Sequence, residues 1–366
     1  MFIYFLISTI LSASIINGPY IDNISKDSAC FRFTIEESTI SWFGWGEDPK
    51  CDKYITPLLP KKDQVVDIYG LKSGVKYCYS IFLPLLNSTY TYLAASSTFT
   101  TFFDETKSTY SFIIYSNTFL NTKDENKRIV SIILSSHTDI SFIINLGNFI
   151  KKTDTEFIYP GDFKDIALSF PIYTLNGEHE HNDKDILYHY GKMRNFSKNG
   201  FPPYYYYIDI SNSRFIFLDR NLDNGSDSLK KGSKQYRWLN EVLKFSNNKK
   251  WIFIFINKPL YPFSYFEKDF DLEELFLNYK VDFVFQNGKN YIRTKKIKYG
   301  IEDDEGIFYI TLGEIDENLL IENDDPIIDC NYMQKGIIKV SINDETLSLD
   351  YYDLDLKLID KFLYSK

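Results

Sequence analysis

The sequence predicts two domains, an amino-terminal all-β sandwich followed by an α/β domain in which helices cover a sheet. Three observations support this fold class. The chain has 366 residues, more than one hydrophobic core usually organises. Up to about residue 104, short strand-like runs alternate with turn-rich stretches, and no segment has the pattern of a long helix. From about residue 105 onward, strand-like runs alternate with helical patterns.

The first segment, Met1–Ile16, is apolar, carries no charge and ends in small residues. This pattern is typical of a signal peptide, so we expect residues 1–17 to direct export to a periplasm, the cell surface or the medium. Because no basic residue precedes the apolar run, an uncleaved anchor or a buried strand stays open as an alternative. No later run reaches the roughly eighteen apolar residues that a membrane span needs, so we expect no span in the mature chain.

Residues 18–104 are expected to form the sandwich, because their alternating runs are spaced as in small antiparallel β domains. We expect strands over Ala29–Ile35, Thr39–Trp45, Gln64–Tyr69, Val75–Phe82 and Thr89–Thr101.

The chain has four cysteines, Cys30, Cys51, Cys78 and Cys330. An even number in an exported chain favours a disulfide, and the spacing favours one among the first three. The sequence leaves the pairing open, and four unpaired thiols stay an alternative.

Residues 105–366 are expected to form the α/β domain. Apolar periodicity predicts helices over 123–135, 233–245 and 272–279. Short runs rich in β-branched and aromatic residues predict the strands between and after them. These strands cover Tyr110–Tyr115, Ile140–Leu146, Trp251–Ile256, Val281–Phe285, Ile307–Leu312, Gly336–Ile342 and Thr346–Tyr352.

Charge and composition exclude one class of partner. The net charge is −9, and no stripe of Lys or Arg follows a helix, which argues against a nucleic-acid partner. The aromatic content of 17% is spread over the whole chain beside abundant Ile, Asn and Lys. We attribute it to AT-rich codon usage rather than to a binding surface.

Several motifs resemble a known family. Gly18–Ile21, Ser41–Gly46 and Leu71–Tyr79 resemble the fibronectin type III-like domain at the front of purple acid phosphatases. Later pieces resemble the calcineurin-like metallophosphoesterase domain that follows it, namely Phe215–Asp219, Gln235–Leu239, Lys258–Tyr261, Tyr291–Arg293 and Ile307–Gly313. The resemblance implies a fibronectin type III-like sandwich over 18–104 and a four-layer α/β sandwich over 105–366.

The resemblance also implies a chemistry. The family holds two metal ions, such as iron, zinc or manganese, close together. One ion activates water and both bind the phosphoryl oxygens. Carboxylates and histidines at strand ends are the ligands that this requires, and their negative charge offsets the two cations.

The first three positions of the family's site depart from that pattern. Asn117 stands where the first carboxylate belongs, and Asn148 stands where the bridging Asp belongs. In Gly177–Glu180, Glu178 replaces the amide ligand while His179 is retained. The family uses this His beside the phosphoryl group as an acid or a transition-state stabiliser, so His179 is the one candidate catalytic residue.

The later histidine positions are lost as well. Asn257 follows the strand that would end in a ligand His, and Asn287 and Lys289 fall where the last two His belong. The chain has four His in all, His137, His179, His181 and His189, so none lies in the last part of the chain. We therefore expect no metal cofactor. Lys289, with Lys258, could instead attract a phosphate or carboxylate.

These residues predict an exported pseudophosphatase that acts by binding a protein, a glycan or a phosphorylated ligand. Two alternatives stay open. One is a phosphoric monoester hydrolase with an altered or single-metal site around Glu178–His181. If that segment is extended, only Glu178 with Glu180, or His179 with His181, can converge. The other is a surface protein that uses mainly its β-sandwich.

Overall fold

A computed structural model describes most of the chain, and the chain divides into two compact units. One contains the residues up to Thr101 together with Lys164–Pro171, and the other contains Phe102–Phe163 and Ile172–Lys366. The expected domains, 18–104 and 105–366, differ from these units because Lys164–Pro171 belongs to the first one. The described residues are 13–51, 53–85, 89–106, 108–118, 121–135, 140–149, 151–152, 157–158, 161–182, 200–201, 204–221, 229–261, 270–316 and 325–366.

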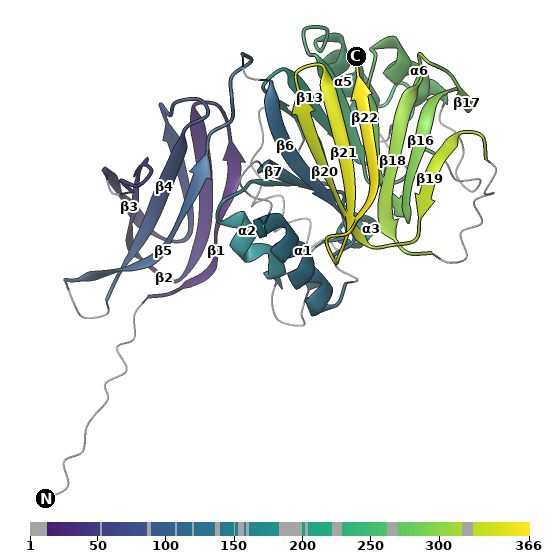
Figure 1. The fold of residues 1–366 in the computed structure, drawn as a ribbon. Coiled ribbons are helices and arrows are strands. Elements are labelled where there is room, and N and C mark those ends of the chain that lie inside the picture. Colours follow the sequence, from purple (N-terminus) through teal and green to yellow (C-terminus); the bar gives the residue numbers. More distant parts are fainter. Residues whose placement is uncertain are drawn as a thin grey trace, which may run out of the picture. The chain divides into compact units, whose positions relative to one another are not determined.

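The first unit is built on one antiparallel sheet of five strands, in the order β1-β2-β4-β5 with β3 paired to β2 (Figure 1). The first strand includes Ile15 and Ile16 from the expected signal peptide, of which residues 1–12 lie outside the described part. Helix α2, Lys164–Ala167, also belongs to this unit. The strands are β1 Ile15–Ile24, β2 Ser28–Glu47, β3 Tyr54–Tyr69, β4 Lys76–Pro84 and β5 Thr91–Thr100.

Strand β2 is one strand of 20 residues, so the expectation of two separate strands here was wrong. The sequence suggested a break because Glu36 and Glu37 interrupt the alternation, and both are exposed. The chain accommodates them by register shifts against β3 on either side of Thr39. Such an irregularity lets polar residues leave the ladder without ending the strand.

Aromatic rings form the core of the first unit. The Phe31 ring lies 4.7 Å from that of Tyr79 and 5.0 Å from that of Phe43, and Phe31 and Tyr79 are fully buried. A disulfide joins Cys51 to Cys78, which resolves the pairing that the sequence left open. The thiols of Cys30 and Cys330 are free.

The second unit contains two larger sheets (Figure 1). The six-stranded sheet has the order β10-β7-β6-β20-β21-β22, with β10, β7 and β6 parallel. Its strands are β6 Thr109–Tyr115, β7 Ile140–Asn145, β10 Ile172–Thr174, β20 Gly336–Asn343, β21 Thr346–Asp353 and β22 Leu358–Ser365.

The nine-stranded sheet has the order β11-β12-β13-β14-β15-β18-β16-β17, with β19 paired to β16, and its strands β13, β14, β15 and β18 are parallel. Its strands are β11 Gly200–Phe201, β12 Tyr205–Ile210, β13 Ser213–Leu218, β14 Trp251–Ile256, β15 Phe283–Lys289, β16 Tyr291–Lys298, β17 Ile301–Glu302, β18 Ile307–Glu314 and β19 Ile328–Tyr332. The other elements in the described part of the chain are a small pair, β8 Lys151–Lys152 and β9 Phe157–Ile158, a turn η1 Gly161–Phe163, and helices α1 Lys123–Ser135, α3 Glu178–Asn182, α5 Lys234–Lys244 and α6 Phe270–Asn278.

Strand β14 shows how the layers of this unit are held together. Its side chains alternate between two buried faces, as expected for a central parallel strand. On one face Phe253 lies 6.0 Å from Phe112 of the six-stranded sheet, so the two sheets stack through aromatic rings. On the other face Ile252, Ile254 and Ile256 pack with the apolar residues of α5 and α6. The helices therefore cover the outer face of the nine-stranded sheet.

Several of the expected elements have the bounds that the sequence indicated. Helix α1 covers the range that its periodicity predicts, and β14 does the same. Ser233 caps α5, because its side chain accepts a hydrogen bond from the Tyr236 N–H. Within the described residues, no helix is both long and apolar enough to cross a membrane.

Candidate functional site

Three of the asparagines selected from the sequence meet where strands of both large sheets end. Asn117 follows β6, Asn148 follows β7, and Asn287 lies near the end of β15. The Asn148 Nδ2 atom donates to Asn117 Oδ1 at 2.7 Å, and Asn117 Nδ2 donates to Asn287 Oδ1 at 2.9 Å. We call these three residues the amide cluster.

The backbone at two members of the amide cluster favours asparagine. Asn117 and Asn148 have φ angles of 54° and 56°, in the left-handed region. Among residues with a Cβ atom, Asn adopts this region with the least strain. Asparagine therefore suits the turn geometry at both positions.

The amide cluster satisfies its own hydrogen-bonding groups. Asn117 Oδ1 also accepts from Asn287 Nδ2 at 3.4 Å, and Ser116 Oγ donates to Asn287 Oδ1 at 3.0 Å. The Asn148 Oδ1 atom accepts from the His179 N–H at 3.0 Å. An amide both donates and accepts, whereas three carboxylates could only accept and would repel one another. The cluster is therefore a neutral network that needs no cation to balance it.

The segment Glu178–His181 is helical rather than extended, so the pairings that an extended segment would allow do not form. It forms α3, which begins after Gly177. The Glu180 carboxylate accepts from the Gly177 N–H at 2.7 Å, and the His181 N–H donates to Gly177 O at 3.1 Å. This is half of a capping box, in which the third helical residue bonds back to the residue before the helix. Residues two apart on a helix face nearly opposite directions, so Glu178 and Glu180 do not converge.

Glu180 holds two loops together. It is fully buried, and its carboxylate also accepts from the backbone N–H groups of Asn148 and Phe149, each at 2.8 Å. Glu178, by contrast, is exposed. The two acidic residues that the sequence offered as ligands for a single metal ion therefore differ in role, because Glu180 is committed to backbone N–H groups.

The two histidines of α3 differ in their hydrogen bonds. The half-buried His179 is tied through its backbone to Asn148. The Nδ1 atom of His181 is buried and has no hydrogen-bond partner among the described residues. His137 and His189 lie outside the described part of the chain.

A second group of polar residues forms around Asp219, just after β13. Asp219 is fully buried, and its Oδ1 atom accepts from Asn257 Nδ2 at 2.7 Å and from the Asn221 N–H at 2.8 Å. Burial raises the pKa of Asp219 to about 6, opposed by these hydrogen bonds and by the charge of His181. The Oδ2 atom has no partner among the described residues.

Asp219 is the residue that the sequence reasoning missed as a candidate. It ends the motif Phe215–Asp219, which carries part of the resemblance, but the sequence indicates no role for it. The signal that could have found it is its position, directly after the fully buried strand β13. In parallel sheets, ligands bind beyond the carboxyl ends of the strands, so a polar residue directly after such a strand is a candidate site residue.

Asn257 belongs to the group around Asp219 rather than to the amide cluster. Its Nδ2 atom also donates to Asn176 O at 2.5 Å, and its Oδ1 atom accepts from the Arg220 N–H at 2.7 Å. Its amide is therefore occupied by two neighbouring loops, one after β10 and one after β13. The position where the family would place a ligand His has a structural role here.

Lys289 is paired, which weakens the expectation that it attracts an anion. Its Nζ atom lies 2.7 Å from a carboxylate oxygen of Glu314, and both side chains are partly exposed. Lys258 is half-buried and has no carboxylate within ion-pair distance in the described part of the chain. The charge of Lys289, two residues after Asn287 of the amide cluster, is therefore balanced by Glu314.

The side chains at the carboxyl ends of these strands do not supply the ligands that a two-metal centre needs. The oxygens of the amide cluster accept hydrogen bonds from one another, and those of Glu180 accept from backbone N–H groups. In the described ranges, no three His, Cys, Asp or Glu side chains gather as a metal site would require. Hard divalent and trivalent cations need anionic oxygen or imidazole ligands. We therefore derive no reaction step through metal ions.

Two stacked sheets, with polar loops where their parallel strands end, define the phosphoesterase fold seen in purple acid phosphatases. Purple acid phosphatase PPD1 from seeds of yellow lupin (Lupinus luteus) matches with a TM-score of 0.77 and 15% identity, over 96% of this chain and 74% of that one. PhoD matches with a TM-score of 0.72 and 11% identity, over 95% and 90%. No family model and no curated protein matches the sequence. At these identities the likeness shows the fold alone.

Proposed function

We propose that this protein is an exported pseudophosphatase, which keeps the phosphoesterase fold but acts by binding a protein, a glycan or a phosphorylated ligand. The amide cluster is the observation that carries the proposal. Its three amides occupy the positions that the resemblance assigns to metal ligands, and they bond to one another. Hydrolysis of a phosphate ester on this fold relies on cations to bind the phosphoryl oxygens and to activate water. A neutral, self-satisfied network supplies neither.

One observation favours the alternative of a phosphoric monoester hydrolase with an altered site. Asp219 has a pKa raised to about 6, and it interacts electrostatically with His181. A buried carboxyl group that titrates near neutral pH can act as a general acid or base. If the chain is a hydrolase, we expect its site to involve Asp219 and His181 together with His179, rather than Glu178 and Glu180.

The deciding experiment measures metal content and turnover on the same purified protein. The chain is incubated with iron, zinc and manganese, desalted, and analysed by elemental mass spectrometry and with p-nitrophenyl phosphate between pH 5 and 8. We expect less than about 0.1 metal ion per chain and no turnover, because the ligands that the two-metal mechanism needs are missing.

Four variants make the result interpretable. Hydrolysis that is lost in His179→Ala, His181→Ala or Asp219→Asn would establish the alternative and refute the pseudophosphatase. Hydrolysis that survives all three of these changes, and that also survives Asn117→Ala, would point to a contaminating enzyme.

Export is tested separately. The protein is secreted from a eukaryotic or bacterial host and its amino terminus is sequenced, with a cut near residue 17 expected.

A further inference from the structure

A hollow of about 460 Å³ lies at the amino ends of β14 and β15, the ends of the strands away from the amide cluster. Its apolar base includes Leu243 and Tyr279, and none of its lining residues is acidic. We call it the lysine hollow, after the five lysines that line it, Lys244, Lys249, Lys250, Lys280 and Lys366.

Three of these lysines are held by ion pairs. Lys249 lies 3.4 Å from Asp209, Lys250 lies 2.7 Å from Asp344, and Lys366 lies 2.6 Å from Asp282. Each carboxylate cancels much of the charge of its lysine and fixes the direction of its side chain. None of the three carboxylates lines the hollow, so the pairs do not place negative charge on its wall.

The other two lysines are not paired. Lys244 is the last residue of α5, and Lys280 lies two residues beyond the end of α6. Both are exposed, and neither has a carboxylate within 4.0 Å among the described residues. Net positive charge in the lysine hollow therefore comes from this pair.

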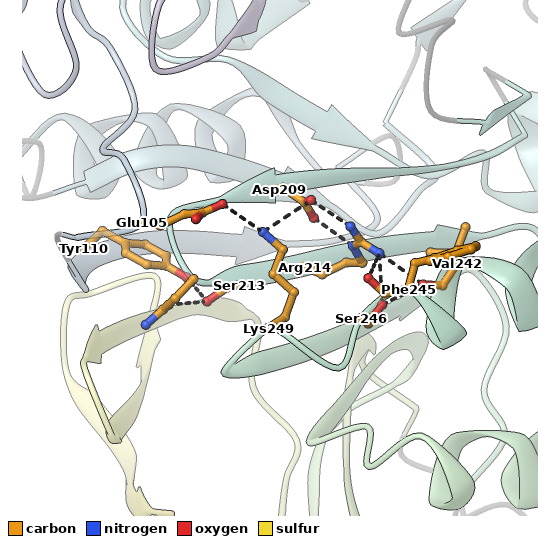
Figure 2. A network of polar contacts seen from close by, with 10 residues as sticks. Glu105, Tyr110, Asp209, Ser213, Arg214, Val242, Phe245, Ser246 and Lys249 are labelled. Carbon is orange, nitrogen blue, oxygen red and sulfur yellow. Dashed lines mark hydrogen bonds and ion pairs between the residues drawn. The ribbon is translucent and has the colours of Figure 1, made fainter.

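A lysine at a helix end often serves only to satisfy the last carbonyl groups, but in α5 that role is taken by Arg214. Figure 2 shows the Arg214 guanidinium pointing at the end of this helix. Its Nη1 atom donates to Val242 O at 3.0 Å and to Phe245 O at 3.1 Å, while its Nε and Nη2 atoms donate to the Asp209 carboxylate, each at 2.8 Å. The ammonium group of Lys244 is not needed there.

The end of α6 is closed by its own backbone. The Lys280 N–H donates to Leu277 O at 3.1 Å, and the Val281 N–H donates to Phe276 O at 3.0 Å. This pattern normally has Gly or Asn at the left-handed position, which Lys280 occupies with a φ of 54°. A side chain in this region strains the backbone, and the ammonium group of Lys280 makes no contribution to the closing bonds.

We propose that the lysine hollow binds a small polyanion that carries phosphate or sulfate groups. The two unpaired ammonium groups supply donors for oxyanions, and the apolar base accommodates the carrier of those groups. The net charge of −9 repels a polyanion at long range, so any binding has to come from this local arrangement. The site does not depend on whether the chain hydrolyses phosphate esters.

Isothermal titration calorimetry of the full chain tests the site, with inositol hexakisphosphate and sucrose octasulfate as probes. Inositol and sucrose are the uncharged controls. The double variant Lys244→Gln/Lys280→Gln removes both unpaired charges, and Lys127→Gln/Lys357→Gln removes two exposed lysines that do not line the hollow. We expect the first pair to weaken the binding of the polyanion about fivefold or more and the second pair to leave it within about twofold, with weaker binding at higher salt.

Each outcome decides something. Preference for one probe tells phosphate from sulfate chemistry and supports the site. Binding of neither probe, or equal weakening by both double variants, overturns it. Phosphate release is measured in the same samples, because hydrolysis there would refute the pseudophosphatase while leaving the site standing. Circular dichroism confirms that the four exposed Lys→Gln changes leave the fold intact.

Discussion

The two ends of the parallel strands in the second unit use polar residues in opposite ways. At the carboxyl ends, the amide cluster is neutral, and its members bond to one another. At the amino ends, Lys244 and Lys280 carry charge that no described carboxylate pairs and that no helix end requires. A closed neutral network stabilises the fold and gives a solute little to bind. A charge without an ion pair has donors left for a solute, and it is therefore the better indicator of a binding site.

The largest effect on stability is expected at Glu180, which joins the loops beside the amide cluster. Its carboxylate accepts from three backbone N–H groups, the buried one of Gly177 and the partly buried ones of Asn148 and Phe149. Glu180→Ala leaves all three without an acceptor, so we expect the free energy of unfolding to fall by about 3–5 kcal/mol in urea titrations. The exposed neighbour gives the control, because Glu178→Ala is expected to change stability by less than about 0.5 kcal/mol. Equal effects would mean that the contacts of Glu180 do not hold this end together.

A carboxylate at position 117 breaks the neutrality of the amide cluster. In Asn117→Asp, an oxygen replaces the Nδ2 atom that donates to Asn287 Oδ1, and a charge is buried without a cation. We expect a loss of about 1–3 kcal/mol at pH 7.5, measured by urea unfolding. The loss shrinks toward pH 4, because a protonated carboxyl group can donate in place of the amide.

The control for that change is Asn343→Asp, at an exposed position of β20, where less than about 0.5 kcal/mol is expected. A second arm adds zinc or manganese. If Asn117→Asp alone gained full stability with metal, the neighbouring residues would fit a cation better than their hydrogen bonds indicate. That result would break the contrast between the two ends of the strands.

Sequence reasoning reached the framework of this site but not its details. The buried strand Trp251–Ile256 and the helix from Lys123 to Ser135 follow from apolar periodicity, which a single chain displays directly. Asn117 and Asn148 could be placed at strand ends because each follows such a run. Spacing alone could not show that their amides bond to each other and to Asn287, since the two sheets meet only in the folded chain.

The misjudged elements have local causes. Glu180, three residues after Gly177, caps the first turn of α3, but the same sequence also suits an extended loop. Strand β2 continues past its two exposed acidic residues because β3 holds both sides of the irregularity. Asp219 was overlooked because its importance comes from burial, which raises its pKa and which a sequence does not show.

The smallest effect, and the one that separates function from structure, is expected at Asp219. Its pKa is raised from 3.8 to about 6 in the folded chain, so folding favours the protonated form. The stability that protonation provides is present below pH 4 and is lost as the pH rises through about 6. Asp219→Asn removes the buried charge and keeps an oxygen for Asn257 Nδ2. We therefore expect it to raise the free energy of unfolding by about 1–2 kcal/mol at pH 7.5 and to leave it unchanged at pH 4.

A matched control uses Asp355→Asn, which removes an exposed carboxylate paired with Arg128 and is expected to have little effect at either pH. A gain confined to high pH means that Asp219 is a charge kept at the expense of stability, as at sites under selection for activity or binding. If Asp219→Asn instead destabilises the chain at both pH values, then Asp219 has only a structural role, like the amide cluster. In that case Lys244 and Lys280 of the lysine hollow, rather than Asp219, would be the charges available to a ligand.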